Sequence, residues 1–206
     1  MRSNQQTDVP LGHYKAIYEQ SSAAEIAART GLLFDEASGR FKMTLVGTQF
    51  YVTHPVFMVE EGEIEPYEEI LLIRYLLEGK YAPASGEMLA YKDMPWGPVY
   101  LSQFHMRVIQ RFAREFGGDP GRLKTALEAT QGLKFEEFSS AADAAYKLEF
   151  LDGLYISILI WKGDDEFPGT AQVLFSDNFK YAFTAEDVAV VGDVLMWRLK
   201  KALKKV

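Results

Sequence analysis

Cysteine is absent from this chain of 206 residues. The chain can therefore form no disulfide, thiolate zinc site, cysteine nucleophile or self-ligated iron–sulfur cluster. No run of apolar residues approaches the roughly 18 that a membrane-spanning helix needs. The first residues, MRSNQQTDVP, contain no hydrophobic segment of the kind found in a secretory signal. These absences predict a cytoplasmic protein with no membrane partner.

The chain also lacks an excess of basic residues. Lys and Arg number 22 against 29 Asp and Glu, which gives a net charge of −7 and a pI of about 5.1. A nucleic-acid-binding surface needs clustered Lys and Arg, so we expect no nucleic-acid partner. The one basic cluster lies at the end of the chain, where positive charge suits the negative end of a helix. It comprises Arg198, Lys200, Lys201, Lys204 and Lys205.

The remaining composition is that of an ordinary globular protein. Apolar residues make up 48% and charged residues 25% of the chain, enough for one good-sized core. Residues 1–12 are polar and include Pro10 and Gly12, so we expect a flexible arm there. No solenoid repeat or low-complexity tract divides residues 13–206. The sequence therefore predicts a single compact domain over 13–206.

Apolar periodicity assigns most of the secondary structure. It predicts helices over 13–29, 66–79, 103–116, 119–129 and 184–206. Ser102 is the expected cap of the third helix. Thr184 and Asp187 form a variant of the capping box at the start of the last one. Period-2 patterns or short apolar runs predict strands over 32–34, 41–45, 50–54, 88–91, 133–138, 146–150, 155–161 and 171–175. Asp152-Gly153 is a strong hairpin signal. Grouped strands and grouped helices indicate an α+β fold with a mainly antiparallel sheet and helices packed on it.

Common catalytic and cofactor-binding motifs are missing. The chain has no Gly-x-Ser-x-Gly elbow, phosphate-binding loop or dinucleotide fingerprint. Gly117 to Gly121 reads as a helix-breaking turn. His13, His54 and His105 have no i+4 His or Glu partner of the metalloprotease kind, so the sequence predicts no metal site. His54 and His105 are each candidates for an axial ligand or general base, or for a structural histidine.

The acidic loop Asp164-Asp165-Glu166 offers three adjacent carboxylates between apolar segments. Hard cations prefer oxygen ligands, but the spacing is not that of a calcium loop. The ordinary alternative is a solvated acidic turn. Trp161, Phe167 and Pro168 flank the carboxylates, and such bulky neighbours favour a loop that is held in place.

A second aromatic loop precedes the central helix. Met94-Pro95-Trp96-Gly97-Pro98-Val99-Tyr100 is stiffened by proline and suits the wall or lid of a pocket, or an ordered loop that caps the core. The candidate ligand-binding residues are Trp96, Tyr100, His105, Trp161, Asp164, Asp165, Glu166 and Phe167.

The segment from Trp161 to Pro168, the strand that follows and the helix capped by Thr184 together resemble the bacterial and archaeal domain-of-unknown-function 3786 family. The resemblance covers about residues 13–203. It implies an origin in anaerobes, where some members carry an added cysteine-rich iron–sulfur segment like that of corrinoid or CO-metabolism proteins. This chain has no cysteine for such a segment, and the family supplies no catalytic residues to assign.

We therefore expect a soluble accessory or binding protein rather than an enzyme, associated with a cofactor of unknown identity. Its site is expected between the 164–168 loop and the 96–105 segment. One alternative is a carboxylate- or metal-dependent enzyme in which the acidic loop acts with His105 or His54. The other is a protein-interaction domain without a small-molecule site.

Overall fold

The computed structural model describes residues 5–95 and 97–206, with side chains from residue 11 onward. It confirms the α+β class: all paired strands are antiparallel and join in one sheet of order β4-β3-β2-β7-β8-β9-β5, with β1 beside β2 and β6 beside β7. The strands are β1 (Phe34–Asp35), β2 (Arg40–Leu45), β3 (Thr48–Thr53), β4 (Val59–Glu60), β5 (Met88–Ala90), β6 (Phe135–Glu137), β7 (Ala144–Leu151), β8 (Leu154–Trp161) and β9 (Thr170–Ser176).

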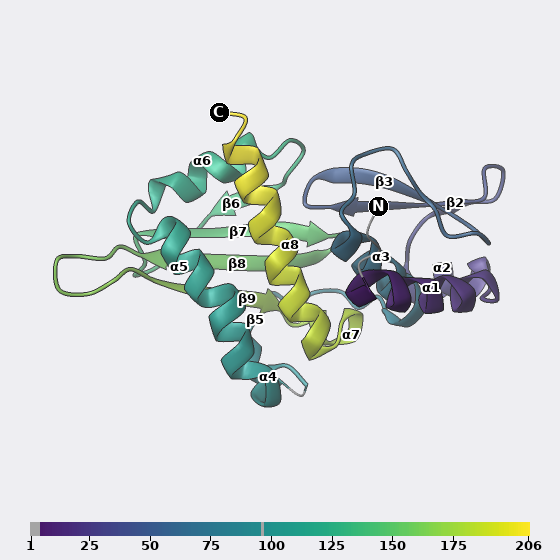
Figure 1. Cartoon of the computed structure of the whole chain (residues 1–206), viewed down its shortest axis with the longest axis horizontal. Helices are drawn as coiled ribbons and strands as arrows, with labels where there is room; N and C mark the ends of the chain where they lie inside the picture. Colours follow the sequence, from purple (N-terminus) through teal and green to yellow (C-terminus); the bar gives the residue numbers. More distant parts are fainter. Residues whose placement is uncertain (1–4, 96) are drawn as a thin grey trace.

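Two groups of helices pack on this sheet (Figure 1). The helices are α1 (Gln5–Glu19), α2 (Ala23–Thr30), α3 (Pro66–Glu78), α4 (Gly97–Phe104), α5 (Gln110–Phe116), α6 (Gly121–Ala129), α7 (Phe179–Ala182) and α8 (Ala185–Leu203). A 3₁₀ turn η1 (Tyr91–Asp93) precedes α4, and a π-helix η2 (His105–Ile109) joins α4 to α5. None of the described helices is both long and apolar enough to cross a membrane.

Two helix boundaries differ from the sequence-based prediction. The first helix begins at Gln5, inside the stretch expected to be an arm, and Leu11 within that stretch packs against the core. It ends at Glu19, and a second helix follows because Ser22 caps it: the Ser22 hydroxyl accepts a hydrogen bond from the Glu25 N–H at 3.4 Å.

The central helix also differs from the prediction. It begins at Gly97 rather than after Ser102, which lies inside α4. Its α-helical geometry is interrupted at His105–Ile109 by the π-helix. Val108 of this π-helix packs so closely on α8 that a Cβ added at Gly192 would lie 2.5 Å from its Cγ2 atom. Both differences arise from tertiary packing, which local periodicity does not encode.

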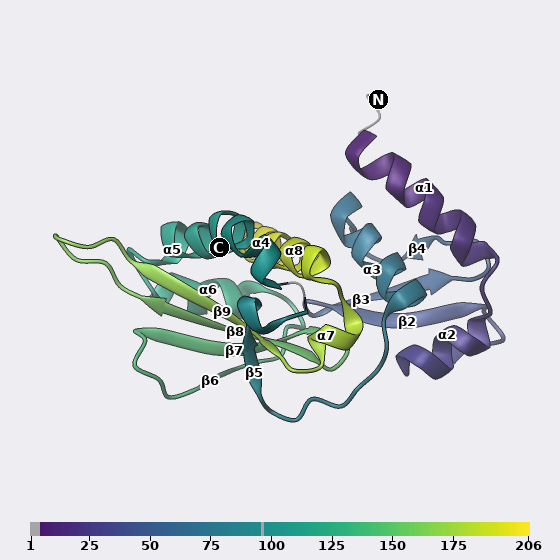
Figure 2. The same ribbon diagram turned by 90° about the horizontal axis from the view of Figure 1, so that it is seen from below.

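Strands β7, β8 and β9 carry a large part of the core. Ile156, Ile158 and Ile160 alternate along β8 and are fully buried on one face of the sheet. Figure 2 shows α4, α5 and α8 gathered on one side of these strands. Thr184 and Asp187 form the expected capping box at the start of α8. This half of the molecule therefore combines a twisted antiparallel sheet with a layer of helices.

The two parts of the sheet meet at a narrow joint. Leu45 of β2 and Leu151 of β7 are the one pair that links these strands, next to a hydrogen bond from the Val46 N–H to the Phe150 carbonyl at 2.7 Å. The Asp152 carboxylate of the predicted Asp-Gly hairpin accepts from the Thr44 N–H at 2.9 Å. Burial raises the pKa of Asp152. The hairpin turn thus fastens the two parts of the sheet together.

Candidate functional site

The acidic loop between β8 and β9 is braced by its own first carboxylate. The Asp164 Oδ1 atom accepts hydrogen bonds from the N–H groups of Glu166 at 2.9 Å and Phe167 at 2.7 Å. The Asp164 N–H donates to the Phe167 carbonyl at 2.9 Å. These amides hold the pKa of Asp164 below its ordinary value, because they stabilise the ionised carboxylate. Asp164 therefore shapes the turn.

Three glycines anchor this loop to the end of α5. The Gly163 N–H donates to the Gly117 carbonyl at 2.9 Å. A Cβ atom at Gly169 would lie 2.6 Å from the Gly117 Cα atom, so the two backbones touch where no other residue type fits. Asp165 and Glu166 are exposed, and the Phe167 side chain is 67% exposed. The carboxylates thus stand at the tip of a loop whose base is fixed.

We expect Asp164→Ala to loosen the turn without unfolding the protein. The substitution removes the acceptor of two amide hydrogen bonds, so hydrogen exchange at the Glu166 and Phe167 amides should become faster. Asp165→Ala is the matched control and should leave both amides unchanged, because its exposed carboxylate has no such role. NMR-detected exchange measures both. Equal protection in the two variants would contradict the bracing role.

The loop is also expected to depend on pH. Asp164 has a lowered pKa in the folded loop, so the stabilisation from its ionised form is present at neutral pH. It is lost as the pH falls through this lowered pKa, where the carboxylate binds a proton. The same two amides report this loss.

A groove of about 430 Å³ lies beside the base of the loop, and we call it the edge groove. Leu101, Phe104, His105 and Ile109 line its helical side, Trp161, Ala171, Gln172 and Val173 line its strand side, and Ala90, Tyr91 and Lys92 complete it. Most of these side chains are apolar, with a few polar groups among them. This is the composition of a typical ligand site.

The wall of the edge groove is closely packed. The Tyr91 and Phe104 rings stack with centroids 4.0 Å apart and an interplanar angle of 7°. Phe104 in turn meets Phe175 edge to face at 5.9 Å. The Tyr91 hydroxyl donates to the Ala185 carbonyl at 2.6 Å, and burial raises the pKa of Tyr91 to about 12. A fixed wall reduces the entropy lost when a ligand binds.

The edge groove unites two of the residues expected from the sequence. His105 and Trp161 both line it, although 55 positions separate them in the chain. Tyr100 lies on α4 and Phe167 at the loop tip, and neither lines the groove; the same holds for Asp164, Asp165 and Glu166. Trp96 lies outside the described residues. Within the described chain, no carboxylate lines the groove.

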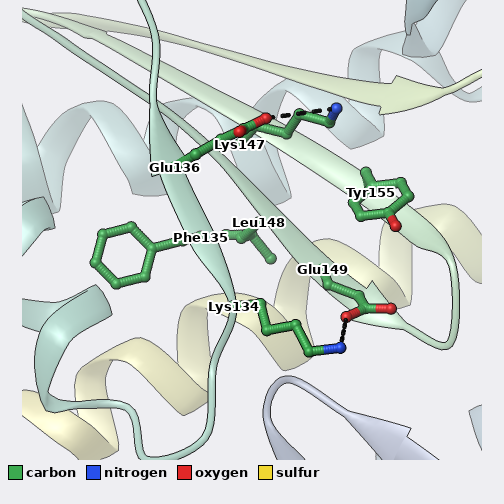
Figure 3. Close-up of a pocket in the computed structure, with 7 residues that line it drawn as sticks. All are labelled: Lys134, Phe135, Glu136, Lys147, Leu148, Glu149 and Tyr155. Atoms are coloured by element: carbon green, nitrogen blue, oxygen red, sulfur yellow. Dashed lines mark hydrogen bonds and ion pairs between the residues drawn. The ribbon is translucent and has the colours of Figure 1, made fainter. Parts of the chain in front are cut away.

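Two further hollows are lined by charges that are already paired. On the sheet surface, Lys147 lies 3.6 Å from Glu136, and Lys134 lies 2.9 Å from Glu149 (Figure 3). A cavity of about 420 Å³ beside α8 contains Arg107 and Arg111, which both bind Asp193. Such exposed pairs contribute little stability.

The other histidines have different surroundings. A ring nitrogen of His54 lies 2.9 Å from the Ser21 carbonyl oxygen, and the ring meets Tyr18 edge to face at 5.1 Å. His13 lies beside Tyr14 on α1. Among the residues that the structure describes, no three His, Asp or Glu side chains gather in a group that could hold a metal ion. His105, by contrast, borders the edge groove.

Comparisons with known proteins give one match. The model of a family described as Domain of unknown function (DUF3786) matches residues 22–198, and this confirms the resemblance of the 161–168 segment. No curated protein and no solved structure matches the chain. The matched range includes the acidic loop, its three glycines and all residues that line the edge groove.

Proposed function

We propose that this chain, which belongs to the DUF3786 family, is a non-enzymatic binding protein whose ligand occupies the edge groove. The observation that carries the proposal is the convergence of His105 and Trp161 on a closely packed, largely apolar groove. Apolar lining supplies affinity, and a few polar groups orient the ligand. Here the polar groups are His105, Lys92 and Gln172.

The geometry favours binding over acid–base catalysis. A general base must reach the proton that it removes, directly or through one water. Asp164 is occupied by two backbone amides, and the described lining of the groove contains a histidine without a carboxylate beside it. The alternative of a carboxylate-dependent enzyme therefore has less support than a binding role.

A flat cofactor is one ligand class that suits this lining. Aromatic walls accept a planar ring system, and the His105 imidazole is a common axial ligand. Haemin and a corrinoid are the probes for this class, and absorbance spectroscopy is the readout. A spectral change that is lost in His105→Ala supports this class, whereas unchanged spectra with both probes exclude it and leave the groove for other ligands.

The binding role itself can be tested with an apolar fluorescent probe. We expect 1-anilinonaphthalene-8-sulfonate to bind the folded protein at one saturable site. Leu101, which is 41% exposed on the groove wall, offers a substitution that keeps the core intact. Leu101→Asp should weaken binding about tenfold, because it places a charge on the apolar wall. A fluorescence titration measures both dissociation constants.

The matched control is Leu33→Asp. Leu33 is 75% exposed and lies before β1, outside the edge groove. This variant should bind the probe as the native protein does. If both variants bind with unchanged affinity, or if both lose affinity equally, the groove is not the binding site and the proposed function fails.

A further inference from the structure

Strand β9 has a neighbour on both sides over only part of its length. It pairs with β8 from Thr170 to Phe175, whereas β5 covers only Leu174 to Ser176 on the other side. Within the described residues, Thr170–Val173 therefore borders a strand only on its β8 side. This open edge forms one wall of the edge groove. An unpaired strand edge is a template for another strand.

The direction of the backbone groups along this edge follows from the ladder. The Asp177 N–H donates to the Glu87 carbonyl at 3.1 Å, so the backbone N–H and C=O groups of Asp177 face β5. Alternate residues of a strand direct their backbone groups to the same side. The same side is therefore faced by the backbone groups of Phe175, Val173 and Ala171. Val173 is only 2% exposed, so Ala171 is the residue that presents its N–H and C=O groups where another chain can reach them.

The charged groups that line the groove indicate the charge of its ligand. Lys92 and His105 are its titratable lining groups apart from Tyr91, whose hydroxyl is engaged by Ala185. No carboxylate lines the described groove, although the whole chain has a net charge of −7. A ligand with a negative charge near Lys92 and apolar groups along the wall complements this surface.

We propose that the edge groove binds an extended peptide segment of a partner protein, which adds to β9 as a further strand beside Ala171. This inference rests on the proposed function, since it names the ligand of the same groove. The peptide carries apolar side chains at alternate positions and an acidic group near Lys92. Its main-chain hydrogen bonds supply affinity, and the pocket for alternate side chains supplies specificity.

The alternation of the strand explains how one peptide satisfies both requirements. In an extended segment, successive side chains point to opposite faces. One set of side chains points toward Leu101, Phe104 and Ile109 on the helical side of the groove. The other set points to the opposite face of the sheet, where the exposed Gln172 lines the groove. A peptide with proline opposite Ala171 lacks the donor for this pairing and is excluded.

The test starts from a phage-displayed library of short random peptides selected on the intact chain. We expect enriched sequences to alternate apolar and polar residues, to contain an acidic residue and to avoid proline in the central positions. The enriched peptide is then labelled with fluorescein, and its dissociation constant is measured by anisotropy. A selection that yields no enrichment over the Leu101→Asp variant overturns the proposal.

N-methylation distinguishes strand addition from side-chain binding alone. A copy of the peptide with methylated backbone amides at alternate central residues keeps all its side chains. Its methylated amides can no longer donate hydrogen bonds. Methylation in the register that faces β9 should weaken binding about tenfold, the loss expected for one or two hydrogen bonds. Methylation in the other register should have little effect. Equal binding of both methylated peptides and the parent overturns strand addition, while the groove remains the site.

A variant of the protein gives the reciprocal test. Ala171→Pro removes the outward N–H, and proline is tolerated on an edge strand when its nitrogen faces away from the neighbouring strand. We expect this variant to fold, as judged by circular dichroism, and to lose the peptide. Retained peptide affinity overturns strand addition. The two proposals can fail separately. If Leu101→Asp weakens binding of the fluorescent probe but no peptide is selected, the groove is a binding site and only the peptide proposal fails.

Discussion

Arg198→Met should lower the free energy of unfolding by about 3–5 kcal/mol, because it leaves the Glu68 carboxylate buried without its cation. Glu68 is 1% exposed. The Arg198 guanidinium binds both of its oxygens, with Nη2 3.0 Å from Oε2, and also donates to the Thr48 hydroxyl at 3.0 Å. The substitution keeps the length of the aliphatic stem, so the measured change reports the loss of the guanidinium group, with its charge and its hydrogen bonds. Chemical denaturation followed by circular dichroism provides the measurement.

Two controls surround this experiment. Adding Glu68→Gln to Arg198→Met should recover part of the loss, because a neutral amide is less costly to bury than a carboxylate and still accepts from the Glu65 N–H. Lys124→Met breaks an exposed i,i+4 pair with Glu128 and should change stability by less than about 0.5 kcal/mol. A loss for Arg198→Met as small as that of Lys124→Met would contradict the view that this pair is buried and essential.

Gly47→Ala is expected to destabilise the fold by about 4 kcal/mol or more, among the largest effects of single substitutions. Gly47 has a φ of +77°, where a side chain is strained. Its Cβ atom would also lie 2.3 Å from the Leu133 nitrogen and 2.5 Å from the Gly132 carbonyl carbon. Both contacts are to backbone, which cannot rotate aside. The β2–β3 turn would have to separate from the turn between α6 and β6. Thermal and chemical unfolding both report this change.

Gly153→Ala separates the two causes. Gly153 has a φ of +84°, but an added Cβ there meets nothing within 4 Å. Its cost should be the conformational strain alone, about 1–2 kcal/mol. The difference between the two variants measures the backbone contact of Gly47. Equal losses would mean that the two turns can separate freely.

The sequence predicts the elements of this fold better than their ends. Alternation along 41–45 and the nearly continuous apolar run over 155–161 are both local signals, and strands form there because their apolar residues are buried in the core. The early start of α1 and the break before α2 depend on contacts with the core and on one serine cap. The π-helix depends on packing against α8. Such boundaries are decided by partners that lie far away in the chain.

The candidate site shows the same division. Trp161 and His105 are recognisable as candidates by residue type, and the structure brings them to one groove. The role of Asp164 could not be predicted, because the sequence alone does not distinguish an aspartate that stabilises a turn from one that binds a ligand. Tyr91, Leu101 and Ile109 were missed, since each looks like an ordinary core residue. The glycines at 117, 163 and 169 are visible in the sequence, but their role in anchoring the acidic loop is evident only from their contacts in the structure.

The narrow joint between β2 and β7 has a consequence for cooperativity. Because one residue pair links β2 to β7, the backbone hydrogen bonds of the sheet couple its two parts only weakly. The two halves are coupled instead by side chains and turns: the Arg198–Glu68 pair, the Asp152 carboxylate on Thr44 and the contact of Gly47 with Gly132. One apolar core also spans both halves, so we expect β1–β4 and β5–β9 to unfold as one cooperative unit in spite of the narrow joint. Peptide binding at β9 would then raise the free energy of unfolding of both halves together.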